Sequence, residues 1–222
     1  MKPYKAVLII LAIIIADQAL KIWVKTHLML DEEIVITHWF RLHFAENRGM
    51  AFSMELPGIW GKALLGFFRS IAAVAGTWYV IHLFKQKAHW GFIVACSAIL
   101  AGAIGNLIDG AVYGIIFSDS YGRIAQFLPA GGGYAGFMQG QVVDMLRFPL
   151  FHGFFPSWVP FWKGQYFEFF NAIFNISDAA ITVGVFIILI FQRTFFKEEN
   201  AGAQPEIANS IHTTTSVTGS EG

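Results

Sequence analysis

Three short motifs of this chain place an aspartate where a long apolar segment meets its flanking loop. They are Asn106-Leu-Ile-Asp109, Val142-Val143-Asp144 and Asn175-Ile-Ser-Asp178. A carboxylate at membrane depth is costly, so such a group usually faces the interior of a helix bundle or a functional cavity. Several carboxylates in one layer, two of them with an asparagine three residues earlier, indicate a reaction centre.

The loop that carries Asp144 must return the chain to the membrane before the last apolar segment begins, which lets its carboxyl approach that of Asp178. Two carboxyls in close contact share one proton, so such a pair can act as general base and general acid toward a water molecule. These residues also allow a proton or ion pathway, or purely structural polar contacts, with Asn175 and Asp178 as a helix cap. The residue types and their spacing do not distinguish among these interpretations.

The composition indicates an integral membrane protein, because 55% of the 222 residues are hydrophobic and only 14% are charged. The 15 basic residues equal the 15 acidic residues, so nothing favours nucleic acid as a partner. A single cysteine, Cys96, excludes an internal disulfide. The seven histidines lack the spacing of a zinc peptidase, and we expect neither a metal nor a cofactor.

Four apolar segments are about 20 residues long and can cross a bilayer: 6–24, 62–84, 90–113 and 176–196. Basic residues flank one end of each, which predicts that both termini are cytoplasmic. Residues 1–196 are therefore expected to form one membrane domain, with extracytoplasmic segments at 28–61 and 114–175. The polar tail, 197–222, is expected to be disordered.

The two extracytoplasmic segments differ in character. The stretch from Ile34 to Phe44 is rich in β-branched and aromatic residues in partial alternation, which predicts a short strand or hairpin on the membrane surface. The segment 114–174 combines three consecutive glycines and several prolines with many Phe and Trp residues, which suits aromatic anchoring in the headgroup layer. We therefore predict an all-α membrane protein with an aromatic-rich interfacial loop or helix.

Polar residues also fall inside the predicted helices. Asp17 and Lys21 lie one turn apart on one face of the first helix, where they either pair inside the bundle or let Lys21 reach a carboxylate or lipid headgroup at the outer interface. On the third helix, Asn106 and Asp109 share a stripe with two glycines. Glycines allow helices to pack closely, but packing alone does not require the two polar side chains. We predict that they support an active site.

Taken together, five blocks of this sequence resemble bacterial lipoprotein signal peptidases, also called signal peptidase II, and occur in the same order as in that family. They are Asp17-Gln-Ala-Leu-Lys21, Asn47-Arg-Gly49-Met-Ala51-Phe52-Ser53, Gly105-Asn106-Leu-Ile-Asp109, Val142-Val143-Asp144 and Phe174-Asn175-Ile-Ser-Asp178. The resemblance runs from about Ala16 to Thr182.

The resemblance implies an aspartic endopeptidase of the bacterial inner membrane, with four transmembrane helices, a small extracytoplasmic β-cradle and an active site at the outer membrane interface. Its substrates would be diacylglyceryl-modified prolipoproteins, cut just before the lipidated cysteine. Besides these substrates, membrane lipids are the expected partners of a monomer. Asp144 and Asp178 would be the catalytic pair, and the supporting residues would be Asp17, Lys21, Asn47, Gly49, Asn106, Asp109 and Asn175.

Two features depart from the family pattern. Gly110 follows Asp109 where the family commonly has arginine, so any contact of that arginine must be absent or come from another residue, with Arg123 and Arg147 as candidates. The stretch between Gly114 and Asp144 is long and glycine-rich, and we interpret it as a possible lid over the site. The alternative functions are a small proton or ion transporter that uses intramembrane aspartates, and a non-catalytic protein that binds a lipidated peptide.

Overall fold

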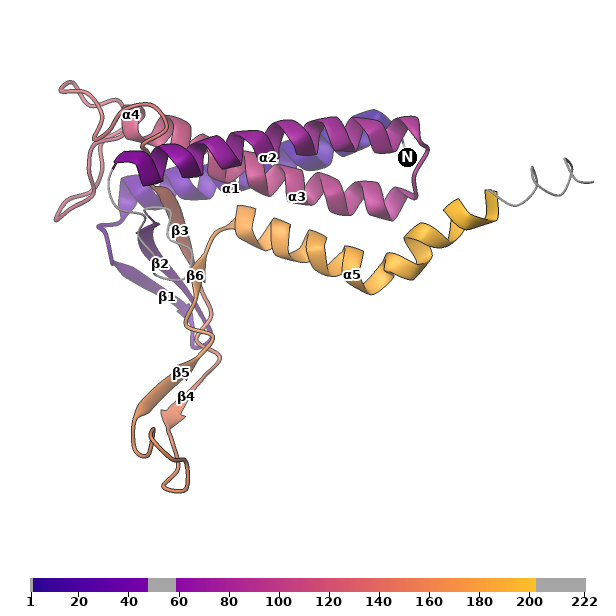
Figure 1. Cartoon of the computed structure of the whole chain (residues 1–222). Helices are drawn as coiled ribbons and strands as arrows, with labels where there is room; N and C mark the ends of the chain where they lie inside the picture. The colour runs from indigo at the N-terminus through magenta and orange to yellow at the C-terminus, as the bar shows by residue number, and fades with distance from the viewer. Residues whose placement is uncertain (1, 48–58, 203–222) are drawn as a thin grey trace, which may run out of the picture.

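The computed structural model describes residues 2–47 and 59–202. Within these residues, four helices are long and apolar enough to cross a membrane, as predicted from the sequence. They are α1 (Pro3–His27), α2 (Ile59–Lys85), α3 (Trp90–Ile108) and α5 (Ile176–Gly202). In Figure 1 the first three run alongside one another, and α5 lies beneath α3. The candidate span in α5 is Ile176–Phe196, as predicted, and the helix itself continues to Gly202, into the tail that was expected to be disordered.

The helices expose apolar side chains and bury polar ones. Among the large hydrophobic residues on the surface, Ile15 is 65% exposed and Val74 is 71% exposed. The side chains of Asp17 and Lys21, in contrast, have no exposed surface. This distribution is the reverse of that in a soluble bundle and is typical of helices that face lipid.

Close contact between α3 and α5 depends on two glycines of α3. A Cβ atom at Gly102 would overlap the carbonyl oxygen of Ser177, and one at Gly105 would overlap the Ser177 hydroxyl. The absence of these side chains lets the first turn of α5 lie directly against α3. The residues at the start of α5 thereby come close to those at the end of α3.

The prediction of an all-α protein is wrong, because the described residues also contain six β-strands. An antiparallel sheet has the order β1-β2-β3-β6, formed by Glu33–Thr37, Phe40–Asn47, Val142–Arg147 and Ile173–Phe174. A separate hairpin pairs β4 (Phe151–Phe154) with β5 (Tyr166–Phe169). The prediction of strands between Ile34 and Phe44 is confirmed, whereas those after residue 141 were missed because the whole segment 114–174 was interpreted as an interfacial loop.

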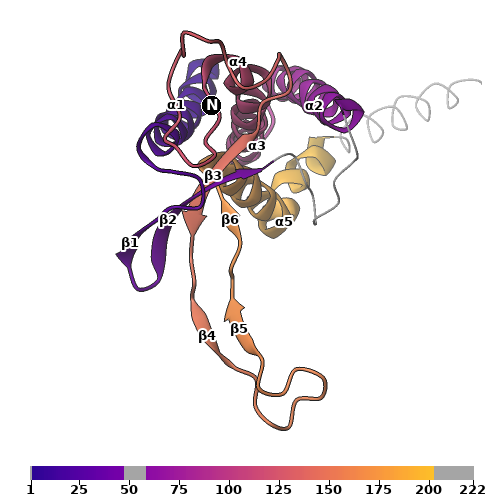
Figure 2. The same ribbon diagram turned by 90° about the vertical axis from the view of Figure 1, so that its left-hand side faces the viewer.

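The register of the larger sheet positions motifs that are far apart in the sequence beside one another. Ala45 of β2 is opposite Asp144 of β3, and Leu146 of β3 is opposite Phe174 of β6. Because α5 begins at Ile176, β6 delivers Asn175 directly to the strand that carries Asp144. The sheet therefore joins the end of the helix bundle through β3 and β6 (Figure 2).

After α3, the chain continues through a π-helical turn, η1 (Asp109–Tyr113), and the short helix α4 (Gly114–Ile116). The glycine-rich segment that follows folds back onto this end of the bundle. The backbone N–H of Ala135 donates to the Gly114 carbonyl at 2.8 Å, and that of Gly140 donates to the Gly110 carbonyl at 2.9 Å. A Cβ atom at Gly133 would overlap the carbonyl oxygens of Gly114 and Ile115.

This close approach generates a prediction for Gly133. We expect Gly133→Ala to lower the melting temperature of the purified protein, because the added methyl must push the segment away from α4. Gly131→Ala is the matched control, since a Cβ atom there meets nothing within 4 Å. Equal melting temperatures for the two variants would contradict the observed packing.

The β4–β5 hairpin projects away from the bundle and carries many aromatic side chains. In both views it extends roughly across the direction of the helices (Figures 1 and 2). Phe161 is 94% exposed and Trp158 is 79% exposed. Glu168 forms an ion pair with Arg147: both carboxylate oxygens of Glu168 lie 3.1 Å from the Nη2 atom of Arg147. An exposed aromatic arm, whose tip also carries Lys163, suits the interfacial layer of a membrane.

We therefore expect the hairpin tip to lie in lipid. In a Cys96→Ala background, a fluorophore attached to Phe161→Cys in reconstituted vesicles should be quenched by brominated phospholipid more than by aqueous iodide. Ala130→Cys, at an exposed position of the glycine-rich segment, is the water-facing control and should show the opposite preference. Equal iodide quenching at both positions would contradict membrane insertion of the hairpin.

Candidate functional site

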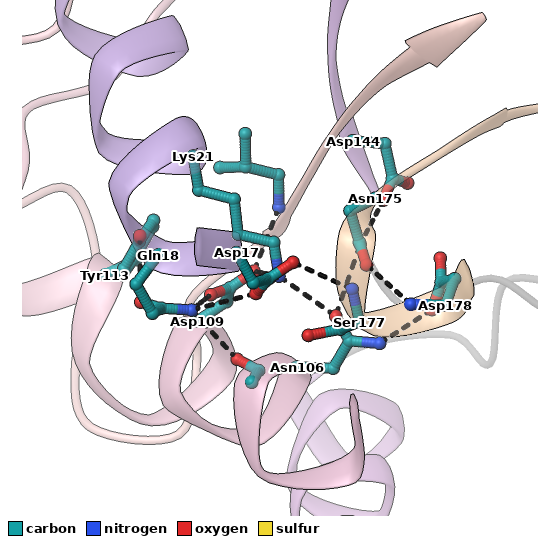
Figure 3. Close-up of polar contacts among 12 residues, drawn as sticks. Asp17, Gln18, Lys21, Asn106, Asp109, Tyr113, Asp144, Asn175, Ser177 and Asp178 are labelled. Atoms are coloured by element: carbon teal, nitrogen blue, oxygen red, sulfur yellow. Dashed lines mark hydrogen bonds and ion pairs between the residues drawn. The ribbon is translucent and has the colours of Figure 1, made fainter. Parts of the chain in front are cut away.

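A polar cluster lies where α1, the end of α3, β3 and the start of α5 meet (Figure 3). Its centre is the Lys21 ammonium, which is 2.8 Å from Asp17 Oδ2, 2.7 Å from Asp109 Oδ2 and 3.1 Å from Asn106 Oδ1. An ammonium has three donors, and each has a partner here. Lys21 therefore pairs inside the bundle, with Asp17 of its own helix and with Asp109 after α3, and none of its donors remains for a headgroup.

Asp17 and Asp109 connect this ammonium to other elements. Asp17 Oδ1 accepts a hydrogen bond from the backbone N–H of Ser177 at 2.9 Å, which fixes the start of α5. Asp109 Oδ2 accepts from the backbone N–H of Val143 at 3.3 Å, which fixes β3. The two carboxylates thus hold the residues next to Asp144 and Asp178 in place.

Sequence reasoning missed two neutral members of the cluster. Gln18 donates to Asp109 Oδ1 at 2.9 Å and to the Gly105 carbonyl at 3.2 Å. The Tyr113 hydroxyl donates to Gln18 Oε1 at 3.0 Å. Gln18 adjoins Asp17 in the sequence, but nothing in the sequence connects it to Tyr113.

Two asparagines link the outer pair of aspartates. Asn175 Nδ2 donates to Asp144 Oδ1 at 2.6 Å and to Asn106 Oδ1 at 3.2 Å. Asn106 Nδ2 donates to Asp178 Oδ1 at 2.7 Å. The Asp178 backbone N–H also donates to Asn175 Oδ1 at 2.9 Å, so Asn175 caps α5 as well as orienting Asp144. A short chain of amides therefore connects the two carboxyls.

The two carboxyls have different surroundings. Asp144 is only 5% exposed, whereas Asp178 is partly exposed. Burial raises the pKa of Asp144 to about 7, and the negative charge of Asp178 adds to the rise. Hydrogen bonds from Asn175 and Asn47 and the charge of Lys21 oppose it. Near neutral pH, Asp144 can therefore either keep or release its proton, as a general acid or base requires.

The structure brings together eight of the residues singled out in the sequence. These are Asp17, Lys21, Asn47, Asn106, Asp109, Asp144, Asn175 and Asp178. Gly49 lies outside the described residues. Nothing in the described part of the chain groups three or more His, Cys, Asp or Glu side chains as metal ligands.

Neither arginine that was expected to replace the missing one at position 110 does so. Arg123 pairs with Asp119, and Arg147 pairs with Glu33 and Glu168 in the sheets. Instead, Arg69 of α2 has its Nη1 atom 3.5 Å from the position that a Cβ atom on Gly110 would occupy. The sequence carried a signal for it, because Arg69 interrupts an otherwise apolar span.

A second buried cation, Lys25, was also missed. Its ammonium pairs with Glu46 of β2 and contacts Ser120 Oγ at 2.9 Å. Three aromatic rings surround it at 5.1–5.8 Å from ring centroid to Nζ, those of Phe44, Phe117 and Tyr134. Lys25 continues the stripe of Asp17 and Lys21 at a spacing of four residues, and it attaches β2 to α1.

The sequence and the fold are both similar to those of known proteins. The family model described as signal peptidase (SPase) II matches residues 9–194. The chain belongs to the signal peptidase II family. A lipoprotein signal peptidase of Porphyromonas gingivalis is 45% identical over 183 residues, which cover 82% of this chain and 80% of the relative.

A lipoprotein signal peptidase of Amoebophilus asiaticus is 34% identical over 205 residues, covering 89% of this chain and 81% of the relative. A solved bacterial membrane enzyme is similar with a TM-score of 0.55 and 21% identity, covering 92% of this chain and 94% of that one. Another has a TM-score of 0.55 and 24% identity, with 85% and 92% covered. These structures share the fold.

The environment of Asp144 generates a prediction for its titration. In infrared difference spectra between the unmodified protein and Asp144→Asn, we expect the carboxyl band to titrate at about pH 7. Asp178→Asn removes the nearby negative charge, so the Asp144 midpoint should fall. Asp119→Asn, remote from the cluster, should leave it unchanged. A midpoint near the ordinary aspartate value of 3.8 would contradict the burial of this carboxyl.

Proposed function

We propose that this signal peptidase II family member removes signal peptides from diacylglyceryl-modified prolipoproteins, as an aspartic endopeptidase that cuts just before the lipidated cysteine. The observation that carries the proposal is the pair of carboxyls, Asp144 and Asp178, each oriented by one of two linked asparagines but placed in unequal environments. Because the two carboxyls are chemically identical, a difference in environment is what allows one to act as the acid and the other as the base.

The proposed reaction begins with Asp144 protonated, because burial favours its neutral form, and with the more exposed Asp178 ionised. Asp178 takes a proton from water as the water oxygen bonds to the scissile carbonyl carbon. Asp144 then gives its proton to the leaving amide nitrogen as the carbon–nitrogen bond breaks. The products are the carboxyl end of the signal peptide and the free amine of the cysteine, and proton exchange between the aspartates restores the starting state.

The asparagines have a different role from stabilising an oxyanion. The Nδ2 group of Asn106 donates to Asp178, and that of Asn175 donates to Asp144 and Asn106. Their donors are already directed at the aspartates, so we assign them to orienting the catalytic carboxyls. Asp17 and Asp109, which both pair with Lys21, support these residues through their backbone contacts to α5 and β3.

We place the site at the outer interface of the bacterial cytoplasmic membrane, with both termini in the cytoplasm. The N-terminus and the end of α5 lie at the end of the bundle opposite the sheet (Figure 1). Basic residues gather near that end, including Lys2, Lys5, Lys85 and Lys87, which supports a cytoplasmic location. The sheet and the aspartates would then face outward, where a lipidated cysteine is found.

A proton or ion transporter suits this arrangement poorly. Among the described residues, the end of the bundle opposite the sheet has an apolar core that includes Val80, Phe92, Ile93 and Leu100. A pathway needs titratable groups through the full membrane thickness. The buried charges instead gather at the other end.

The test is in vitro cleavage of a diacylglyceryl-modified prolipoprotein peptide in the presence of a chelator. We expect Asp144→Asn and Asp178→Asn each to lower kcat by about 10²- to 10⁴-fold, the usual contribution of a positioned acid or base. Substrate binding, measured by fluorescence anisotropy, should persist in both variants, which separates an enzyme from a binding protein.

Asp119→Asn is the matched control, since this aspartate is only partly buried and is paired with Arg123 outside the cluster. It should cleave at the unmodified rate. Full activity in either Asp144→Asn or Asp178→Asn would overturn the proposed mechanism.

A further inference from the structure

Arg69 is a charged residue in an otherwise apolar stretch of α2. Its neighbours Phe67, Phe68 and Ile71 are exposed on the bundle surface, at 58%, 57% and 48%. A guanidinium at this depth is costly unless it faces a polar interior. Arg69 is therefore expected to have a partner inside the protein.

The guanidinium faces the aspartate cluster. Its Nη1 atom lies 3.5 Å from a Cβ position built on Gly110, the residue that follows the fully buried Asp109. The charges of Asp109, Asp178 and Asp144 all act on it. Arg69 thus approaches the site from α2, on a side that α1, β3 and α5 do not occupy.

Arg69 differs from Lys21 in how its charge is used. Lys21 makes short ion pairs with Asp17 and Asp109 and bonds Asn106 with its third donor. No carboxylate in the described ranges 2–47 and 59–202 lies within the 4.0 Å ion-pair distance of Arg69. Its charge therefore acts on the three aspartates together, without being matched to one of them.

The charge of the site requires such a group. Asp17, Asp109 and a singly ionised Asp144–Asp178 pair together carry three negative charges, whereas Lys21 supplies one positive charge. Lys25, the next cation along α1, is paired with Glu46. An excess of negative charge disfavours ionisation of every carboxyl nearby.

We propose that Arg69 is a positioning residue whose positive charge keeps the Asp144–Asp178 pair singly ionised at neutral pH. This inference rests on the proposed peptidase function and adds a residue to it. Without the cation, the pair would hold both protons to higher pH, and the base that activates water would be lost.

Position 110 could supply the same positive charge as Arg69. A Cβ atom there would be in ordinary contact with the Arg69 guanidinium, so a longer side chain at position 110 would enter the space that the guanidinium occupies. An arginine at either position can place its charge beside Asp109. The two positions should therefore be interchangeable as a source of that charge.

The experiment measures the pH dependence of kcat/KM for cleavage of a diacylglyceryl-modified peptide. Removing a positive charge raises the pKa of nearby carboxyls, so Arg69→Gln should move the acidic limb upward by about one pH unit. Activity below that limb should fall about tenfold. Arg69→Lys should keep the original limb, as should the double variant Arg69→Gln with Gly110→Arg.

The charged groups that face the pair are the same in each variant: Asp17 and Lys21 of α1, and Asp109 of η1. Arg193→Gln is the control, because it removes an exposed arginine at the far end of α5. It should leave the profile unchanged.

An unshifted acidic limb in Arg69→Gln would overturn the inference, whether the rate falls or not, because a purely packing role lowers activity at all pH values. Failure of the Gly110→Arg change to move the limb back would also overturn it. If Asp144→Asn remains inactive in the same assay, the proposed peptidase function survives either result.

Discussion

The buried Lys21 ammonium is the interaction on which the rest of this structure depends. Removing an ammonium and two carboxylates from water is unfavourable unless their geometry lets each satisfy the others. Asp17 and Asp109 meet that requirement, and their remaining oxygens bind the backbone of α5 and β3. Four segments that are distant in the sequence are thereby fixed around one charge.

The aspartates around this ammonium fall into two groups with different partners. Lys21, Asp17 and Asp109 are fully buried, and their ion pairs and backbone hydrogen bonds hold other elements in place. Asp144 and Asp178 are held by neutral amides, which leave part of each carboxyl free to exchange a proton. The rigid charged residues therefore lie directly beside the two aspartates at one end of the bundle.

The sheets extend this arrangement beyond the membrane-spanning helices. β2 is attached to α1 through Lys25 and Glu46, and its last residue, Asn47, hydrogen-bonds to Asp144. β6 passes directly into α5. The sheet therefore connects both α1 and α5 to the strand that carries Asp144. The aromatic hairpin lies farther out.

The sequence by itself determined the membrane class, the four spans and the five motifs, because hydrophobic length and local spacing are properties of a continuous segment. It also brought Asp144 and Asp178 together as candidates. Tertiary structure alone decided that Asp144 is the buried member of the pair and that Lys21 points inward. It also added Gln18, Tyr113 and Arg69 to the cluster.

These features join residues far apart in the chain: Ser177 N–H bonds Asp17 across 160 positions, and Tyr113 bonds Gln18 across 95. No local pattern encodes such contacts. The strands after residue 141 were missed for a related reason. The aromatic residues of β4 and β5 suit either an interfacial loop or a hairpin, and β3 is defined by its pairing with the distant β2.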